Sequence, residues 1–458
     1  MSAVLGLDEC GRASHDDLRQ ARRPIAEGDA SRPFAFHAGG SVSLAQFLAQ
    51  VRGVAATLPE APCAIHLCED RYRFLVALCA AALRGQVGLL PPSRAPAVVE
   101  CVRRAHPGAY CLGDAEAGAL VEHVLPAVLP GREGPVPLVA QDTLAVIGFT
   151  SGSTGEPTAN HKTWGGFRTS TAQNLAALRS LWPADAHAHI VATVPPQHMY
   201  GMELSVLMPL LGPAAVHAGR PFFPDDVAVA LGHAAGQRLL VTTPVHLRAL
   251  VESGVSLPPL AGIVSATAPL ARELAAEAEA RFGCEVREVF GSTETCVIAR
   301  RRSAHESAWT PLPGVRVLPQ PDGALVHAQH LAAPVRLADL VEVDDAGRFE
   351  LRGRNADLLE IAGKRASLGD LTRKLQAIPG VREGVVFQLD ADARGVRRIA
   401  ALAVAPGLDA GTLLASLRAQ VDPVFLPRPL RCVEALPRNE TGKLPRDALL
   451  RLLQRGKD

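Results

Sequence analysis

Apolar residues recur in two alternating patterns between residues 44 and 290. Short apolar runs such as 63–68 and 262–265 have the length and composition of buried strands. They alternate with segments of helical periodicity such as 44–58 and 71–84. This alternation is typical of a parallel sheet with helices on both faces. The pattern therefore predicts an α/β fold.

The same alternation continues through the middle of the chain. Helices are predicted at residues 165–181, 203–211, 224–235, 245–253 and 271–282, and strands at 144–149, 189–194, 239–242, 262–265 and 285–290. From residue 313 the pattern changes to short runs with turn signals, at 315–318, 324–327 and 349–352, which predict antiparallel strands. Residues 1–40 have weak periodicity and predict no element.

A domain boundary is predicted near residues 353–357, before a tail with its own strand and helix pattern. At 458 residues the chain is too long for one ordinary core. We expect a large N-terminal domain, residues 1–354, of mainly parallel sheets covered by helices plus a small antiparallel part. A small α+β C-terminal domain, residues 355–458, is expected to follow.

The composition favours a small-molecule enzyme. A net charge of +1 and a hydrophobic content of 48% are typical of a soluble globular protein and give no electrostatic reason for a nucleic-acid partner. The C-terminal tail has an excess of basic residues, which either forms a solvated face or faces an anionic partner.

The chain carries no sign of export or membrane insertion. Its nine cysteines are scattered without C-x-x-C spacing, which favours reduced thiols over a disulfide framework or a zinc site. The amino terminus lacks the basic start and apolar region of a signal peptide. The most apolar segment, residues 74–90, is interrupted by Arg84 and Gln86, so we expect no membrane span and a cytoplasmic protein.

A segment rich in hydroxyl groups and glycine follows the predicted strand 144–149. Its sequence at 149–162 is Phe-Thr-Ser-Gly-Ser-Thr-Gly-Glu-Pro-Thr-Ala-Asn-His-Lys. Its glycines permit a tight turn, and its hydroxyls and backbone amides can donate to phosphate oxygens. It is not a Walker loop, because Pro157 follows and no Gly-Lys pair is present. By composition alone, a surface turn is an equally good interpretation.

This segment resembles the phosphate-loop signature T-S-G-S-T-G-x-P of the superfamily of adenylate-forming enzymes, which includes acyl-CoA synthetases, luciferases and peptide-synthetase adenylation domains. The resemblance implies ATP binding by Thr150, Ser151, Gly152, Ser153, Thr154 and Gly155. Glu156 stands where the family commonly has a basic residue and would repel a triphosphate. Lys162 is the nearest cation that could compensate, and we include it among the ATP-binding residues.

A second motif follows the predicted strand 285–290, where open α/β sheets place their ligands. The sequence at 289–295, Val-Phe-Gly-Ser-Thr-Glu-Thr, puts a carboxylate near the phosphate loop, so Glu294 predicts Mg²⁺. Taken alone, the stretch could be a polar turn. It resembles the Y-G-x-T-E motif of the same superfamily. That resemblance implies that ATP is contacted by Phe290 and Gly291 at adenine, by Ser292, by Thr293 at phosphate, and by Glu294 through the metal.

Two further segments resemble the walls of the family's nucleotide and acid sites. The sequence Ser-Ala-Thr-Ala-Pro-Leu at 265–270 is similar to the adenine segment S-G-G-A-P-L, with alanine and threonine in place of two glycines. The sequence Pro-Pro-Gln-His-Met-Tyr-Gly at 195–201 is similar to the P-x-x-H-x-x-G stretch of the carboxylate pocket. The resemblance assigns ATP binding to Thr267 and Ala268, and substrate binding to Ser265, Ala266, His198, Tyr200 and Gly201.

The 195–201 stretch also bears on the choice of substrate. It lacks the aspartate with which peptide-synthetase domains pair an α-amino group, which disfavours amino acids as substrates. His198 could lie over the substrate carboxylate as a gate. A lone histidine is more often a hydrogen-bonded structural residue, and this alternative stays open.

The remaining motifs lie toward the C-terminus. Asp339 occupies the place of the aspartate in T-G-D, which accepts from the ribose hydroxyls, and Arg354 matches a family arginine at ribose or phosphate. Ala356 stands at the usual hinge position, where Asp or Lys is common. Residues 361–366 resemble the glycine loop of the thiol tunnel, which assigns that role to Gly363, Lys364 and Arg365.

The last motif is Leu-Pro-Arg-Asn-Glu-Thr-Gly-Lys-Leu-Pro-Arg at 436–446, which resembles the terminal P-x-x-x-T-G-K-x-x-R signature. A lysine is a compact cation that can lie between a carboxylate and an α-phosphate, so we predict Lys443 as a catalytic residue with Thr293 and Glu294. The resemblance further implies a mobile C-terminal domain that rotates between two half-reactions.

The resemblance implies an ATP- and Mg²⁺-dependent ligase of a small-molecule carboxylic acid, with CoA or the phosphopantetheine of a separate acyl carrier protein as acceptor. The sequence is similar to ligases of aryl-polyene pigment pathways, and this resemblance suggests 4-hydroxybenzoate or a cinnamate-like acid as the substrate. A fatty acyl-AMP ligase and a non-catalytic nucleotide-binding relative are the alternatives.

Overall fold

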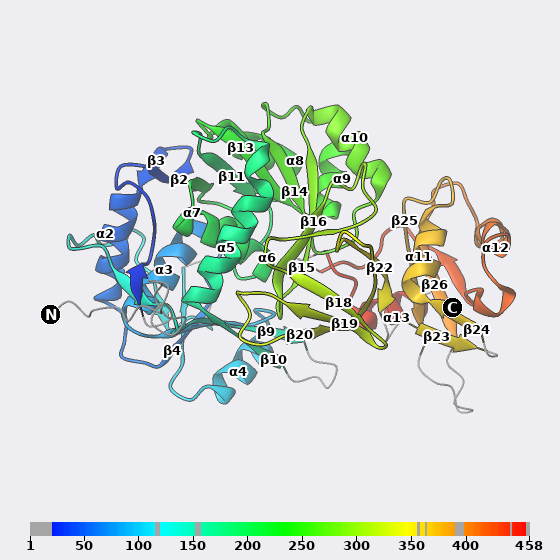
Figure 1. Ribbon diagram of the computed structural model, residues 1–458, viewed down its shortest axis with the longest axis horizontal. Helices are drawn as coiled ribbons and strands as arrows, with labels where there is room; N and C mark the ends of the chain where they lie inside the picture. Colours follow the sequence, from blue (N-terminus) through cyan, green and yellow to red (C-terminus); the bar gives the residue numbers. More distant parts are fainter. Residues whose placement is uncertain are drawn as a thin grey trace. The chain divides into compact units, whose positions relative to one another are not determined.

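The structure is a computed structural model, and it describes residues 21–114, 120–151, 157–354, 358–361, 364–389, 398–439 and 442–454. The chain divides into two compact units (Figure 1). The first unit comprises Met1–Ser307, Pro311–Val315 and Ala328–Ala333, and the second comprises Ala308–Thr310, Arg316–His327 and Pro334–Asp458. The phosphate-loop residues 152–156 and the tunnel residue Gly363 lie outside the described residues.

Among the described residues, the largest sheet runs in the order β17-β16-β15-β14-β13-β11-β12-β2-β3, in which β17 is the short strand Thr310–Pro311. The strands from β15 to β2 are parallel, and the flanking strands β16 and β3 are antiparallel to their neighbours. The bounds are β2 Pro33–His37, β3 Gly40–Ser43, β11 Ala188–Ala192, β12 Ala214–His217, β13 Gln237–Thr242, β14 Gly262–Ser265, β15 Val286–Ser292 and β16 Cys296–Arg301.

Helices cover this sheet because its strands are apolar on both faces. One face packs against α8 (Pro224–Gly232), α9 (Pro244–Glu252) and α10 (Arg272–Phe282) (Figure 1). The buried leucine, valine and alanine side chains of these helices share one core with the strands. Strands β11 and β16 also contact elements outside that core. These are α5 (Trp164–Leu178), which is followed by η2 (Arg179–Leu181), and the π-helical turn η3 (Met202–Leu207).

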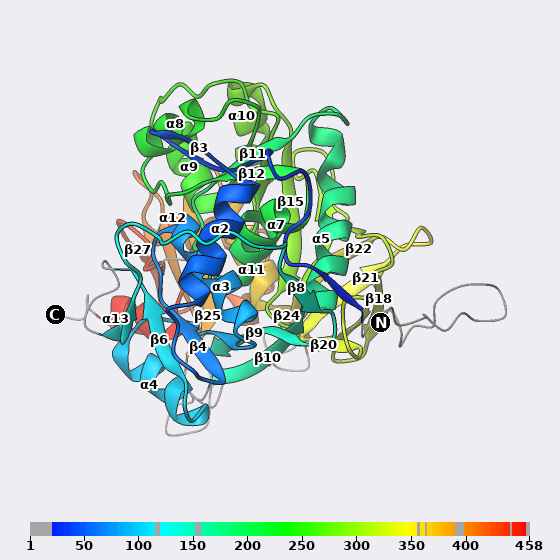
Figure 2. The same ribbon diagram turned by 90° about the vertical axis from the view of Figure 1, so that its left-hand side faces the viewer.

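A second sheet of the first unit runs in the order β10-β9-β5-β4-β6-β7, with β10 antiparallel to β9 and the other pairs parallel. Helices α2 and α3 lie side by side, and α3 contacts β4, β5 and β6 (Figure 2). The bounds are α2 Leu44–Ala55, β4 Cys63–His66, α3 Arg71–Leu83, β5 Val87–Leu90, α4 Pro96–Ala105, β6 Tyr110–Gly113, β7 His123–Val124, β9 Leu144–Ser151 and β10 Pro157–Thr163. A small antiparallel pair joins β1 (Arg22–Pro24) and β8 (Leu138–Ala140).

The second unit begins with short antiparallel strands. They are β18 (Arg316–Gln320), β19 (Gly323–His327), β20 (Val335–Leu337), β21 (Asp339–Val343), β22 (Phe349–Arg354), β23 (Leu358–Ile361) and β24 (Lys364–Ser367). These strands pair as the sheet β18-β19-β20 and as the hairpins β21-β22 and β23-β24.

The end of the second unit has a sheet of its own, β25 (Glu383–Gln388), β26 (Ile399–Val404) and β27 (Leu430–Cys432). Alternate residues of β26 enter two cores: Ala401 and Ala403 pack with α11 (Leu368–Gln376) and α12 (Ala410–Arg418), whereas Ala400 and Leu402 pack with α13 (Arg446–Gln454). Helices therefore lie on both faces of this sheet, as a small α+β unit requires.

The α/β class with mainly parallel sheets and a smaller antiparallel part is confirmed. The helix predicted at 203–211 instead begins at Met199 and runs as α6 (Met199–Gly201), η3 and α7 (Met208–Leu211). Residues 157–163, expected to continue the phosphate loop, form β10, and β2 comes from a segment for which no element was predicted. A boundary near residue 354 stays a prediction.

Two expectations drawn from composition can be compared with the described residues. Within them, no helix has both the length and the apolarity needed to cross a bilayer. The cysteines at 63, 68, 79, 101, 111, 284, 296 and 432 are all free thiols.

Candidate active site

Three of the predicted motifs come together within the first unit. Gly148, in β9, has no side chain; a Cβ added there would lie 3.1 Å from Cγ2 of Thr293 and 3.4 Å from Cε of Met199. The strand that leads into the phosphate loop therefore packs directly against the 289–295 and 195–201 segments. Any larger residue at position 148 would push these segments apart.

The β9–β10 hairpin contacts Glu294 through two side chains. The Thr150 hydroxyl donates to Oε1 of Glu294 at 3.3 Å. The Lys162 ammonium donates instead to the backbone carbonyl of Glu294, at 2.6 Å. From the sequence we expected Lys162 to face phosphate. In the structure its amine binds the backbone of Glu294, the candidate metal ligand. A role for Lys162 in binding ATP itself stays a prediction.

The turn that carries Glu294, residues 292–297, is closed by its own side chains. The Ser292 amide donates to the Thr295 hydroxyl at 3.0 Å, and the Thr295 amide donates to the Ser292 hydroxyl at 3.2 Å. Cys296 adopts φ +60°, which is uncommon outside glycine. A Cβ at Gly291 would lie 2.0 Å from the carbonyl oxygen of Cys296, so glycine is required at 291.

Two ionisable residues that the sequence analysis missed also lie at this turn. Glu203, in η3, accepts from the Val297 amide at 2.8 Å and from Asn174 Nδ2 at 3.0 Å. Burial raises the pKa of Glu203, and its hydrogen bonds act in the opposite direction. Nε2 of His330 lies 2.7 Å from the carbonyl oxygen of Thr295, and burial lowers the pKa of His330. The sequence does carry a sign of Glu203, because it is a lone charged residue in the apolar run 199–211. Nothing in the sequence around His330 marks that residue.

The 265–270 segment begins at the end of β14. Its last residue is held by Glu288, whose carboxylate accepts from the Leu270 amide at 2.9 Å. Thr267 adopts φ +82°, a conformation that favours glycine. Among the described residues, the hydroxyls of Ser265 and Thr267 have no hydrogen-bond partner and are buried. Ala266 is buried and Ala268 is half-buried.

The 195–201 segment enters the core of the first unit. His198 is half-buried and precedes α6. Tyr200 is buried, and its hydroxyl lies 3.1 Å from the carbonyl of Thr242 and 2.9 Å from that of Val264, so it binds the carboxyl ends of β13 and β14. Burial raises the pKa of Tyr200 well above its ordinary value. Contact of Tyr200 with substrate stays a prediction.

Gly201 and Arg71 explain how this segment is held. A Cβ at Gly201 would lie 2.0 Å from the Pro195 carbonyl oxygen. The fully buried Arg71 guanidinium donates to the carbonyls of Ala192 at 3.0 Å and Val194 at 2.6 Å, where β11 leads into the segment. The stretch is therefore fixed at both ends.

The other predicted residues belong to the second unit. Asp339 and Arg354 are paired residues of the β21–β22 hairpin, and Lys364 and Arg365 begin β24. The Lys443 amide donates to Asn439 Oδ1 at 2.9 Å, and the Asn439 amide donates to the Lys443 carbonyl at 2.9 Å. Their approach to the first unit's motifs stays a prediction.

The residues around Glu294 fit Mg²⁺. A carboxylate and a hydroxyl are hard oxygen ligands, and Mg²⁺ is commonly held by one or two carboxylates together with substrate phosphates. In the described parts of the chain, neither lysine nor arginine forms an ion pair with the Glu294 carboxylate, so its charge is available to a cation. Those same parts contain no cluster of three His, Cys, Asp or Glu residues that could form an all-protein metal cage.

Comparisons with known proteins agree with this geometry. The family described as AMP-binding enzyme matches residues 30–329. A 4-coumarate–CoA ligase of Rhodobacter capsulatus is 30% identical over 302 residues, covering 66% of this chain and 75% of that protein. A probable 2-succinylbenzoate–CoA ligase of Mycobacterium tuberculosis is 27% identical over 340 residues, covering 68% of this chain and 85% of that protein.

Solved structures show the same fold. The o-succinylbenzoate CoA synthetase of Bacillus subtilis, in complex with ATP and magnesium ion, has a TM-score of 0.79 at 18% identity, over 93% of this chain and 99% of that one. ATP-bound MatB of Rhodopseudomonas palustris has a TM-score of 0.78 at 20% identity, over 93% of this chain and 97% of that one. The fold, the converging motifs and the match over residues 30–329 lead to one conclusion: the chain belongs to the family of AMP-binding enzymes.

Proposed function

We propose that the protein is an ATP-dependent carboxylic acid ligase that forms an acyl-adenylate and then transfers the acyl group to a thiol. The observation that carries this proposal is the contact between Thr150, at the start of the phosphate loop, and the carboxylate of Glu294. It joins a phosphate-binding strand end to a carboxylate able to hold a cation. The CoA-ligase names of the relatives support the reaction class.

In the first half-reaction, a carboxylate oxygen of the acid attacks the α-phosphorus of ATP. A new P–O bond forms, the bond to the β-phosphate oxygen breaks, and pyrophosphate leaves. Thr150, Thr293 and the loop amides orient the phosphates, and Lys443 stabilises the negative charge that builds on the α-phosphate. Bound Mg²⁺, held by Glu294, would neutralise phosphate charge.

In the second half-reaction, a thiolate attacks the acyl carbonyl carbon and AMP leaves as the thioester forms. The segment around Lys364 and Arg365 is the proposed approach path for the pantetheine arm. Rotation of the C-terminal domain would withdraw Lys443 and bring in this segment, so that one site performs two reactions in turn. CoA is the first candidate acceptor, and an acyl carrier protein is the second.

The proposed substrate is an aromatic acid such as 4-hydroxybenzoate or a cinnamate-like acid. The relatives named for 4-coumarate and 2-succinylbenzoate support an aryl substrate. The absence of an acidic residue from 195–201 argues against an amino acid, because an α-ammonium group would be left unpaired. A fatty acyl-AMP ligase would share the nucleotide contacts and differ only in the acid it accepts.

Pyrophosphate release measured over a panel of acids tests the proposal. The panel holds hydroxybenzoates, cinnamates, medium and long fatty acids and amino acids, each with and without CoA. We expect release to depend on ATP and an aryl acid, and a thioester to form only when CoA is added. Release with fatty acids alone would replace the aryl assignment. ATP binding without release with any acid would refute ligase activity.

A further inference from the structure

Three buried ionisable side chains bind the backbone of one short stretch, residues 294–297. Lys162 donates to the carbonyl of Glu294 at 2.6 Å. The His330 ring lies 2.7 Å from the carbonyl oxygen of Thr295, and Glu203 accepts from the amide of Val297 at 2.8 Å. The three side chains come from β10, from η3 and from residues 328–333, which are far apart in sequence. We call these three residues the turn clamp.

Burying the ionisable side chains of the turn clamp costs free energy, so their presence calls for an explanation. Lys162, Glu203 and His330 are only 8%, 1% and 9% exposed. Burial of charged groups is unfavourable, and apolar residues of similar volume often give an equally stable protein. A buried ionic arrangement is therefore weak evidence for stability and better evidence that a particular local conformation must be held.

The conformation being held is one that the chain does not favour. Cys296, inside the clamped stretch, adopts φ +60° without being glycine, and such residues persist only where the surroundings fix them. Lys162 and His330 fix the two peptide planes before Cys296, and Glu203 fixes the one after it. The backbone on both sides of the strained residue is therefore determined by groups outside the turn.

We propose that Lys162, Glu203 and His330 are positioning residues that fix the Glu294 carboxylate for the cation bound with ATP. This inference rests on the proposed function. Because Lys162 binds the carbonyl of Glu294, its charge stabilises the turn without pairing with the carboxylate, which stays available to a cation. Burial raises the pKa of Glu203, and the charge of Lys162 opposes that rise together with the hydrogen bonds that Glu203 accepts.

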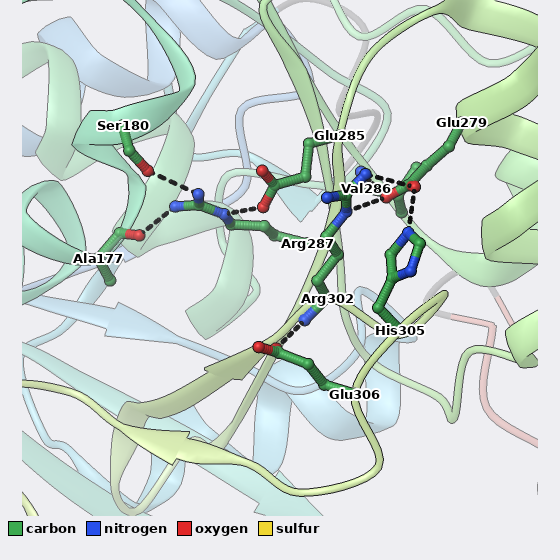
Figure 3. A network of polar contacts seen from close by, with 9 residues as sticks. All are labelled: Ala177, Ser180, Glu279, Glu285, Val286, Arg287, Arg302, His305 and Glu306. Carbon is green, nitrogen blue, oxygen red and sulfur yellow. Dashed lines mark hydrogen bonds and ion pairs between the residues drawn. The ribbon is translucent and has the colours of Figure 1, made fainter.

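The other end of the same hairpin offers a matched control. There Glu279, in α10, receives the Arg302 guanidinium at 2.8 Å through both oxygens, the Val286 amide at 2.9 Å and a contact from His305 at 3.2 Å (Figure 3). This network ties down the β15–β16 hairpin where β15 begins and β16 ends, away from the turn at 292–297. Like the turn clamp, it joins acidic and basic side chains to the backbone of the hairpin, and it should contribute to stability alone.

The experiment compares Lys162→Met, Glu203→Leu and Glu203→Gln with the control Glu279→Ala in the full-length protein. Mn²⁺ affinity is measured by electron paramagnetic resonance with a non-hydrolysable ATP analogue, and amide exchange by mass spectrometry. We expect Lys162→Met and Glu203→Leu to weaken Mn²⁺ binding by about 10- to 100-fold and to speed exchange at 294–297. Glu203→Gln keeps an acceptor for the Val297 amide, so this variant should lose less Mn²⁺ affinity than Glu203→Leu. Glu279→Ala should leave Mn²⁺ affinity unchanged.

The inference is overturned if the clamp variants keep wild-type Mn²⁺ affinity and exchange at 294–297 while their thermal midpoint falls as in Glu279→Ala. It is equally overturned if Glu279→Ala weakens Mn²⁺ binding as much as the clamp variants do. The two proposals can fail separately. Wild-type protein that binds Mn²⁺ with the analogue but releases no pyrophosphate refutes the ligase reaction, and the affinity series still decides the role of the clamp.

Discussion

Thr267 stands in a backbone conformation that disfavours it, and replacing it with glycine should stabilise the protein. Its φ is +82°, and its side chain is β-branched, which makes the strain larger than for most residues. Its hydroxyl is buried without a partner among the described residues. The segment resembles one in which the family has glycine. The variant Thr267→Gly removes both unfavourable features at once.

The expected gain follows from four contributions. Relief of the left-handed strain is worth about 1 to 2 kcal/mol. Removal of a buried hydroxyl without a partner is worth about 1 to 3 kcal/mol. Against these, the greater freedom of glycine in the unfolded chain costs about 0.5 to 1 kcal/mol, and the lost methyl group costs about 0.8 kcal/mol. We therefore expect Thr267→Gly to raise the free energy of unfolding by about 2 kcal/mol.

Urea denaturation followed by tryptophan fluorescence gives the measurement, since Trp164 and Trp182 both lie in the first unit. Thr267→Val separates the contributions, because it removes the hydroxyl but keeps the strain and should gain only the hydroxyl part. The difference between Thr267→Ala and Thr267→Gly reports the strain. If Thr267→Gly lowers the free energy of unfolding, or if Val gains as much as Gly, the strain argument is wrong. A stabilised variant that also accepts bulkier acids would indicate that Thr267 shapes the acid site at the expense of stability.

Three further predictions test other parts of the chain. Lys443→Ala should abolish acid-dependent pyrophosphate release yet spare thioester formation from supplied acyl-adenylate; equal loss of both would contradict its proposed role. Gly201→Ala places a Cβ 2.0 Å from the Pro195 carbonyl and should destabilise by about 1 to 3 kcal/mol and raise the KM for the acid, whereas Gly232→Ala, with open space around it, serves as the control in urea titrations. His66, whose pKa is lowered to about 4 by burial, stays neutral in the fold while the unfolded chain takes up its proton below pH 6.5. Stability should therefore fall by about 1.4 kcal/mol per pH unit from pH 6.5 to pH 4 through this residue, and His66→Leu should flatten a plot of unfolding free energy against pH; an unchanged slope would contradict it.

Much of the fold follows from the periodicity of apolar residues. The strand predicted at 262–265 is β14, and the helix predicted at 271–282 differs from α10 by one residue at its start. Both elements are long or apolar enough for local pattern to decide their type. The strands β10 and β16 were not predicted, because each follows a motif whose polar residues are typical of a loop, and pairing with a neighbour decides their conformation.

The sequence predicted which segments form the candidate site, but not which atoms their side chains contact. The segments around Thr150, Thr293 and Glu294 were identified by their resemblance to the family's motifs, and the structure places Thr150 in contact with Glu294. The backbone target of Lys162 was not predictable, since the direction of a side chain near the base of a hairpin depends on the register of β9 with β10. Glu203 binds the amide of Val297, 94 positions away in the sequence, and His330 lies against the carbonyl of Thr295, 35 positions away. No local pattern encodes such tertiary contacts.

The two turns that carry the proposed catalytic groups are each fixed within their own unit. Glu294 lies on a turn whose contacts among the described residues, from Lys162, Glu203 and His330, come from the first unit. Lys443 lies on a turn closed by Asn439 and braced by Arg438, which donates to the Gly442 carbonyl at 2.7 Å and to Glu383 of β25 at 2.9 Å, all in the second unit. Neither turn would have to refold for catalysis to proceed. An alternation between adenylate formation and thioester formation would therefore be achieved by the proposed rotation of the C-terminal domain, with each catalytic group kept in its local geometry throughout.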